Sequence, residues 1–66
     1  MQLNELTLGV VGMGRVGRRV GAIAAHGFGM RVIYHDVLDV RSQLTFPAAA
    51  VDPATLFREA DVVSLH

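Results

Sequence analysis

The chain has 66 residues, of which 52% are hydrophobic, and its six basic and six acidic side chains give a formal net charge of zero at pH 7. This balance argues against a broad basic surface of the kind that attracts nucleic acid or an anionic membrane. The chain has no cysteine for disulfides or thiolate metal sites, and its three histidines lack the spacing of metal ligands. No apolar run approaches the roughly 18 residues of a membrane span, and the first residues do not resemble a secretory signal. We therefore expect one small, soluble, cytoplasmic domain with no nucleic-acid, membrane or metal partner.

The first two elements expected along the chain are a buried strand and a helix. Residues 7–12, TLGVVG, form a short apolar run that contains β-branched side chains and ends in glycine, which is typical of a strand buried on both faces. Residues 15–28 show helical spacing, and their apolar side chains are expected to share one face: Val16, Val20, Ile23, Ala24 and Phe28. Gly27 and Gly29 supply the signals that end this helix.

The rest of the chain contains two further strands and a short helix. Residues 30–36, MRVIYHD, are β-branched and aromatic and predict a strand that ends in an acid. Residues 37–51 show no clear period and are expected to form a loop. Asp52 followed by Pro53 is typical of an N-cap and a first helical residue, and the short helix continues through residues 54–60. Residues 61–66, DVVSLH, form the third apolar strand.

The alternation of strands and helices with short connections indicates parallel strands joined by right-handed crossovers. The expected fold is therefore α/β: half of a Rossmann doubly wound parallel sheet, in the order β-α-β-α-β with three parallel strands. Such a half sheet leaves an open strand edge and incompletely covered faces. We therefore also expect the chain to self-associate or to form a homo-oligomer.

Three glycines, Gly12, Gly14 and Gly17, spell the G-x-G-x-x-G pattern where the first strand meets the first helix. The first allows a sharp turn out of the strand, the second allows a pyrophosphate to approach the backbone, and the third allows close helix–strand packing. Arg15 and Val16 lie in the first helical turn, where backbone N–H groups and the helix dipole favour phosphate. A packing device without a ligand is the alternative, and the strand–turn–helix context favours the ligand.

Asp36 stands at the end of the second strand, about 20 residues after the glycine pattern, where an acid is expected to bind the adenosine ribose hydroxyls. A carboxylate at this place favours NAD, because the 2′-phosphate of NADP would meet a negative charge. Asp39 is the rival acid, but it falls in the expected loop, and Arg41 is the nearest basic residue downstream. The sequence therefore predicts that residues 1–66 form a partial NAD-binding Rossmann domain.

Three stretches of the sequence resemble the NAD-binding domain of the D-isomer-specific 2-hydroxyacid dehydrogenases: LGVVGMGRVGRRV, HGFGMRVIYHD and LFREADVVSLH. The resemblance implies a fragment of a two-domain, usually dimeric enzyme that transfers hydride between NAD(H) and C2 of a small 2-hydroxy or 2-oxo acid. The family's catalytic arginine, histidine and glutamate lie well downstream of the stretch that matches DVVSLH, so no catalytic residue maps onto this chain. His66 corresponds to a family position near the adenosine side of the cleft and is either cofactor-proximal or structural.

Two other functions stay open at the level of sequence. A corepressor-like or sensor module would bind the nucleotide without catalysis, and a half-Rossmann fragment would serve folding or assembly.

The remaining notable side chains have structural interpretations. His26 is expected to be solvated near the helix end, and His35 to be an ordinary strand side chain. Arg18 and Arg19 are expected on the solvated helix face, whereas Gly21 is expected to extend the close contact between helix and strand. The larger apolar side chains are expected in the core: Phe28, Met30, Phe46 and Phe57.

Overall fold

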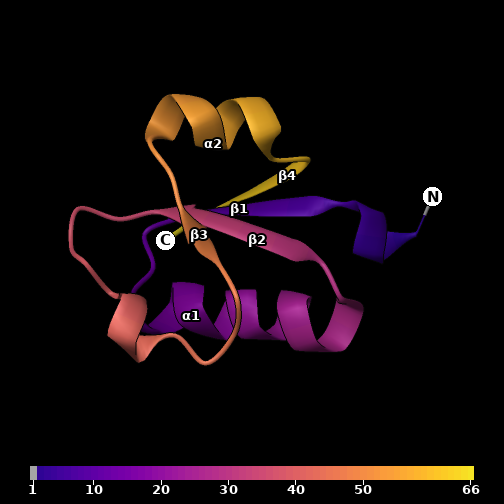
Figure 1. The fold of residues 1–66 in the computed structure, drawn as a ribbon, viewed down its shortest axis with the longest axis horizontal. Coiled ribbons are helices and arrows are strands. Elements are labelled where there is room, and N and C mark those ends of the chain that lie inside the picture. The colour runs from indigo at the N-terminus through magenta and orange to yellow at the C-terminus, as the bar shows by residue number, and fades with distance from the viewer. Residues whose placement is uncertain (1) are drawn as a thin grey trace.

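Two helices cover opposite faces of a four-stranded parallel sheet in the computed structural model, which describes residues 2–66 (Figure 1). The strands are β1 (Thr7–Val11), β2 (Arg31–His35), β3 (Ala49–Ala50) and β4 (Val62–Leu65), in the spatial order β3-β2-β1-β4. Helix α1 (Arg15–Ala22) continues into a π-helical turn (Ile23–Gly27), and α2 (Pro53–Glu59) lies on the other face. Short 3-10 turns occupy Leu3–Glu5 and Arg41–Gln43. The predicted α/β half-Rossmann arrangement is confirmed.

The predicted loop 37–51 is partly wrong, because it contains the fourth strand of the sheet. Ala49 pairs with Ile33 and Ala50 with Tyr34, and the next residue, Val51, donates its N–H to the Tyr34 carbonyl at 2.8 Å. A strand of two alanines is too short to show a hydrophobic alternation in the sequence. Only its backbone hydrogen bonds with β2 define it. The sheet therefore has four parallel strands where the sequence predicts three.

Fewer apolar residues of the α1 segment are buried against the sheet than their spacing in the sequence predicts. Gly17, Gly21 and Ala24 are buried, whereas Val16 and Ile23 are 59% and 56% exposed. Small residues recur one turn apart along the buried side, so the helix can approach the sheet closely on that side. The expectation that the valines and isoleucine of this helix share one core-facing stripe is therefore wrong for these two residues.

Gly21 makes a close contact, but its partner is an aromatic ring from the connection to β3. A Cβ placed on Gly21 would lie 2.6 Å from the ring of Phe46, which is buried as predicted. Phe57 and Phe28, in contrast, are 59% and 49% exposed, so their predicted core positions are wrong. Met30 is partly buried against the core.

The apolar core divides between the two faces of the sheet. On the α1 side it gathers side chains from both central strands, the glycine turn, the π-helical turn and the long connection: Leu8, Val10, Met13, Ala24, Val32, Tyr34, Val40 and Phe46. On the α2 side, Ile33 and Leu56 are fully buried. Gly9 in β1 allows this packing, since a Cβ there would lie 2.7 Å from Ala60 and 2.8 Å from Leu56.

Helix α2 begins as its sequence predicts. The Asp52 side chain accepts a hydrogen bond from the Thr55 N–H at 3.2 Å, and Pro53 takes the first helical position. Asp61 then leads into β4 and fixes the start of β1, because its carboxylate accepts from the Thr7 N–H at 2.8 Å. In the part of the chain that the structure describes, no helix has the length and hydropathy to cross a membrane.

Candidate functional site

The carboxyl ends of β1, β2 and β4 meet at one edge of the sheet, where the parallel register brings Val11 beside His35 and Leu65. Backbone hydrogen bonds hold the residues that follow. Gly12 donates to the His35 carbonyl and His66 donates to the Val11 carbonyl, both at 2.9 Å. This edge presents the turns between strands and helices, which is where parallel α/β sheets bind ligands.

Two glycines of the pattern are required by the packing of the chain itself. Gly12 has a φ of +89°, and a Cβ on it would lie 2.5 Å from the His66 carbonyl oxygen. A Cβ on Gly17 would collide with the Gly12 carbonyl oxygen, which is backbone and cannot rotate away. Their predicted roles, a sharp turn and close helix–strand packing, agree with these contacts.

Gly14 differs from both of its neighbours in the pattern. Its φ of −77° is open to any residue, and a Cβ on it would have no other described atom within 4 Å. Neither side-chain packing nor a positive φ therefore requires glycine at this position. Because Gly14 has no side chain, the backbone at the start of α1 lies open to the surface.

The residue between the first two glycines, Met13, is held on both sides of its backbone. Its N–H donates to Asp36 Oδ2 at 2.7 Å, and its carbonyl accepts from Arg18 Nη1 at 3.2 Å, while its side chain is fully buried. The prediction of Arg18 on the solvated helix face misses its contact with the Met13 carbonyl, and the sequence analysis makes no prediction for Met13. An apolar side chain between two turn glycines is the one signal that could have indicated an inward-pointing anchor.

A cleft of about 400 Å³ lies above this turn and brings the predicted site residues together. Its lining consists of Gly12, Gly14, Arg15, Val16, Gly17, Asp36 and His66. These residues come from the glycine turn, the first turn of α1, the end of β2 and the end of β4. Residues that are far apart in the sequence therefore share one concave surface at the carboxyl edge of the sheet.

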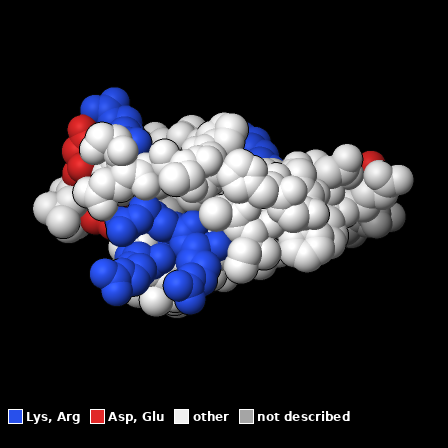
Figure 2. Space-filling model, turned by 90° about the horizontal axis from the view of Figure 1, so that it is seen from below, with Lys and Arg blue, Asp and Glu red and all other residues white. Residues whose placement is uncertain are grey.

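The start of α1 makes one side of this cleft electropositive. The N-cap of the helix is Gly14, which has no side chain to cap the first N–H groups. The first-turn N–H groups of an α-helix have no acceptor within the helix and carry a partial positive charge. Figure 2 shows basic side chains gathered over the face that α1 covers, toward the end where the helix begins, and α1 itself contributes Arg15, Arg18 and Arg19.

Asp36 supplies the negative charge of the cleft. Hydrogen bonds from the backbone N–H groups of Leu38 and then Met13 lower the pKa of this carboxyl below its ordinary value of 3.8. The group is therefore ionised at neutral pH. At the end of β4, His66 Nε2 and Ser64 Oγ lie 2.6 Å apart, so this histidine is held at the rim of the cleft.

Asp39, the rival acid, does not line this cleft. Its carboxylate faces Arg41 instead, with Asp39 Oδ2 2.8 Å from Arg41 Nη2. The choice of Asp36 over Asp39 as the acid of the glycine cleft therefore agrees with the geometry.

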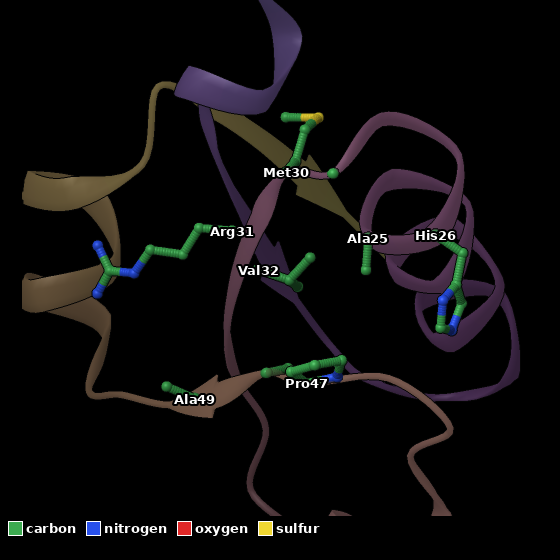
Figure 3. A pocket seen from close by; sticks show the side chains of 9 residues that line it. Ala25, His26, Met30, Arg31, Val32, Pro47 and Ala49 are labelled. Atoms are coloured by element: carbon green, nitrogen blue, oxygen red, sulfur yellow. The ribbon is translucent and has the colours of Figure 1, made fainter.

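A larger cavity, of about 710 Å³, lies away from this edge, between the end of the π-helical turn, the start of β2 and residues 47–49 (Figure 3). Its two charged or titratable side chains already have partners. His26 Nε2 lies 3.1 Å from the Thr45 carbonyl, and Arg31 pairs with Glu59 at 3.2 Å. Figure 3 shows these two side chains on opposite sides of the cavity. Polar groups thus do not converge here. His26 is exposed, as the sequence predicts, and its contact with the Thr45 carbonyl is an addition that the sequence does not indicate. Across residues 2–66, no group of three or more side chains suited to metal ligation comes together.

Known proteins are similar to this chain in both sequence and fold. The family model described as D-isomer specific 2-hydroxyacid dehydrogenase, NAD binding domain, matches residues 1–66. Glyoxylate reductase of Aeropyrum pernix is 38% identical over 69 residues, which cover 100% of this chain and 20% of that protein. D-lactate dehydrogenase of Escherichia coli is 42% identical over 60 residues, which cover 91% of this chain and 18% of that protein.

A solved structure shows the same arrangement with its ligand. The D-isomer specific 2-hydroxyacid dehydrogenase from Lactobacillus delbrueckii ssp. bulgaricus, in its NAD-complexed form, matches with a TM-score of 0.89 at 35% identity. The match covers 100% of this chain and 19% of that one. The chain therefore spans about a fifth of the length of the relatives that it matches.

Proposed function

Because the chain belongs to the D-isomer-specific 2-hydroxyacid dehydrogenase family and matches its NAD-binding domain, we propose that its glycine-lined cleft binds NAD(H). The observation that carries this proposal is the open space at Gly14, in a cleft that also holds the ionised Asp36. Packing within the chain accounts for Gly12 and Gly17. Packing does not account for Gly14, whereas a ligand that lies against the backbone at that point would.

The residues of the cleft fit the parts of the cofactor. The N–H groups of Arg15, Val16 and Gly17 would bind the pyrophosphate at the start of α1. Asp36 would accept from the ribose hydroxyls, because a carboxylate has about four lone-pair sites and two backbone N–H groups already use part of them. His66 would lie beside the adenosine half. The nicotinamide supplies or accepts hydride when the cofactor is bound.

We further propose that the 66 residues are one part of the NAD-binding domain of a two-domain oxidoreductase. The whole enzyme would transfer hydride between NAD(H) and a 2-hydroxy or 2-oxo acid, with its catalytic residues outside this chain. The matched relatives are named for different acids, glyoxylate and D-lactate, so the proposal extends to the class of acid alone. A corepressor-like, sensor or assembly role is not favoured, because the relatives that carry this segment are named as reductases and dehydrogenases.

The proposed cofactor site is tested by titrating the 66-residue chain with NAD, NADP and 5′-AMP in a calorimeter. We expect NAD and 5′-AMP to bind and NADP to bind more weakly, because Asp36 would repel the 2′-phosphate. Gly14→Val is expected to abolish NAD binding, since its side chain would occupy the space that the pyrophosphate needs.

Gly27→Val is the matched control for this substitution. A Cβ on Gly27 would also have no other described atom within 4 Å, but Gly27 lies at the opposite end of the α1 segment, outside the glycine cleft. Circular dichroism should show both variants folded, and Gly27→Val should keep the NAD affinity of the original chain. An unchanged NAD affinity in a folded Gly14→Val chain would overturn the site.

We also propose that the chain self-associates through its open sheet edge and that it acts in the cytoplasm. β4 is the last strand of the sheet on its side, and its Val62 and Leu65 side chains are 46% and 71% exposed. Unpaired strand edges with apolar side chains pair readily with other chains. A single monomeric species at micromolar concentration in analytical ultracentrifugation would contradict this part of the proposal.

A further inference from the structure

A second pocket, of about 280 Å³, adjoins the glycine cleft and shares Asp36 with it. It is formed by the end of β2, the segment that follows and β3, and is lined by Tyr34, Asp36, Val37, Leu38, Asp39, Arg41 and Ala50. The Asp36 residue lines both pockets. Asp36 Oδ2 holds Met13 of the glycine turn, and Asp36 Oδ1 holds the Leu38 N–H in the second pocket.

Arg41 is the basic residue that lines this second pocket, and Asp39 holds its guanidinium in a two-pronged ion pair. Asp39 Oδ1 accepts from Arg41 Nε at 3.0 Å, and Asp39 Oδ2 accepts from Arg41 Nη2 at 2.8 Å. The Arg41 backbone N–H also donates to Asp39 Oδ1 at 3.1 Å, so the pair closes a short local loop. Paired hydrogen bonds of this fork geometry are the strong form of the arginine–carboxylate contact.

The Asp39–Arg41 pair matters because NADP differs from NAD by a 2′-phosphate on the adenosine ribose. If the ribose binds at Asp36, as the proposed function requires, the 2′-phosphate of NADP would carry its charge next to that carboxylate. Enzymes that use NADP place an arginine nearby to accommodate this phosphate. Here Arg41, which lines the second pocket together with Asp36, already directs two of its side-chain donors at another carboxylate.

We propose that Asp39 is a specificity-determining residue, which withholds Arg41 from a ribose 2′-phosphate and so disfavours NADP beyond the repulsion due to Asp36. This inference rests on the proposed NAD site. The side-chain hydrogen bond from Arg41 lowers the pKa of Asp39 to about 2, so the pair stays charged throughout the neutral range. Both side chains are mostly exposed, which leaves Arg41 free to turn toward a phosphate once its partner is neutral.

The substitution Asp39→Asn separates the charge of Asp39 from its role in the turn. An asparagine amide oxygen can still accept from the Arg41 backbone N–H, but it no longer neutralises the guanidinium. Adding Arg41→Gln to this variant removes the cation that the proposal invokes. The two variants therefore distinguish release of Arg41 from a general change in the shape of the loop.

The experiment measures the affinity of adenosine 2′,5′-bisphosphate and of 5′-AMP for the 66-residue chain by calorimetry, with NAD as reference. We expect Asp39→Asn to bind the bisphosphate about five- to tenfold more tightly, as an arginine–phosphate contact replaces an exposed ion pair. The affinities for 5′-AMP and NAD should change by less than about twofold, because an exposed ion pair contributes little free energy. The gain should shrink as salt is raised and should disappear in Asp39→Asn/Arg41→Gln.

Each result decides between the two proposals. If the original chain binds NAD and 5′-AMP but Asp39→Asn shows no gain for the bisphosphate, this inference is wrong and the NAD site stands. A gain that persists in the double variant would also overturn it, because Arg41 would not be its source. If the original chain binds none of the three nucleotides, the proposed NAD site fails and the role of Asp39 fails with it.

Discussion

The two ends of the α1 segment use glycine for different physical reasons. At its start, Gly12 and Gly17 avoid contacts with backbone carbonyl oxygens that no side chain could tolerate. At its far end, Gly29 has a φ of +66° and turns the chain into β2, whereas a Cβ on Gly27 would meet no other described atom within 4 Å. A positive φ or close packing therefore accounts for Gly12, Gly17 and Gly29.

Gly14 and Gly27 are the pair that remains, and they differ in what surrounds them. Both have open space where a Cβ would lie, and neither has a positive φ. Gly14 lines the cleft with Asp36, whereas Gly27 lines neither that cleft nor the larger cavity near β2. A glycine that the fold does not require is a ligand-binding candidate in the first setting and a replaceable residue in the second.

The largest effect that would test this difference is expected from Gly17→Ala. The new Cβ would collide with the Gly12 carbonyl oxygen, and overpacking against atoms that cannot rotate away is expected to reduce the free energy of unfolding by about 3 kcal/mol or more. A domain of this size rarely has more than roughly 3–5 kcal/mol in total, so most molecules should be unfolded. Urea denaturation followed by circular dichroism measures the change. A variant as stable as the original chain would show that the turn and helix can separate without cost.

The same substitution at Gly14 is the control for the loss of stability. Gly14→Ala adds a methyl group to open space, at a backbone conformation that alanine adopts easily. Its free energy of unfolding should fall by less than about 1 kcal/mol, the typical cost of alanine at an N-cap. Equal losses in the two variants would mean that the two glycines do not differ in role.

The sequence predicts well those parts of the molecule in which the local backbone conformation requires a particular residue type. The glycine pattern, the acid at the end of β2 and the Asp52–Pro53 helix start each depend on local backbone chemistry, and each lies where it was expected. The fold class follows from the alternation of strands and helices, which requires only the hydrophobic period of each segment.

The predictions that failed depend on which neighbour a side chain meets. Nothing local distinguishes Phe46, which is buried against Gly21, from Phe57, which is exposed on α2. The contact of Arg18 with the Met13 carbonyl and the pairing of β3 with β2 arise only when the segments are brought together. Tertiary contacts of this kind leave no periodic signal in a single sequence.

A smaller effect is expected from acid, and it should appear at the start of α1. The pKa of Asp36 is lowered below 3.8 in the folded chain, so its ionised form stabilises the fold above that pH. This contribution is lost as the pH falls from 3.8 through the folded pKa, because the protonated acid accepts the Met13 and Leu38 N–H groups less well. Asp36→Asn should therefore be less stable than the original chain at neutral pH.

The difference between these two chains should narrow as the pH is lowered below 3.8. Asp39 and Asp52 also have lowered pKa values and remain in both chains, so their acid loss cancels when the two are compared. Urea denaturation at stepwise lower pH gives the measurement. A difference that stays constant with pH would show that the Asp36 charge does not hold the glycine turn.

The smallest effect expected is a gain in stability at the far end of the helix. Gly27 lies in the π-helical turn with open space around its Cβ position, so Gly27→Ala should stabilise the chain by about 0.4–1 kcal/mol through the lower entropy of its unfolded state. Gly29→Ala, two residues on, should instead cost roughly 1–2 kcal/mol, because its φ of +66° lies in the left-handed region. Thermal unfolding of both variants checks the pair. A loss of stability in Gly27→Ala would mean that open space and an ordinary φ do not suffice to make a glycine replaceable. The inference that the packing of the chain does not require glycine at position 14 would then be wrong too.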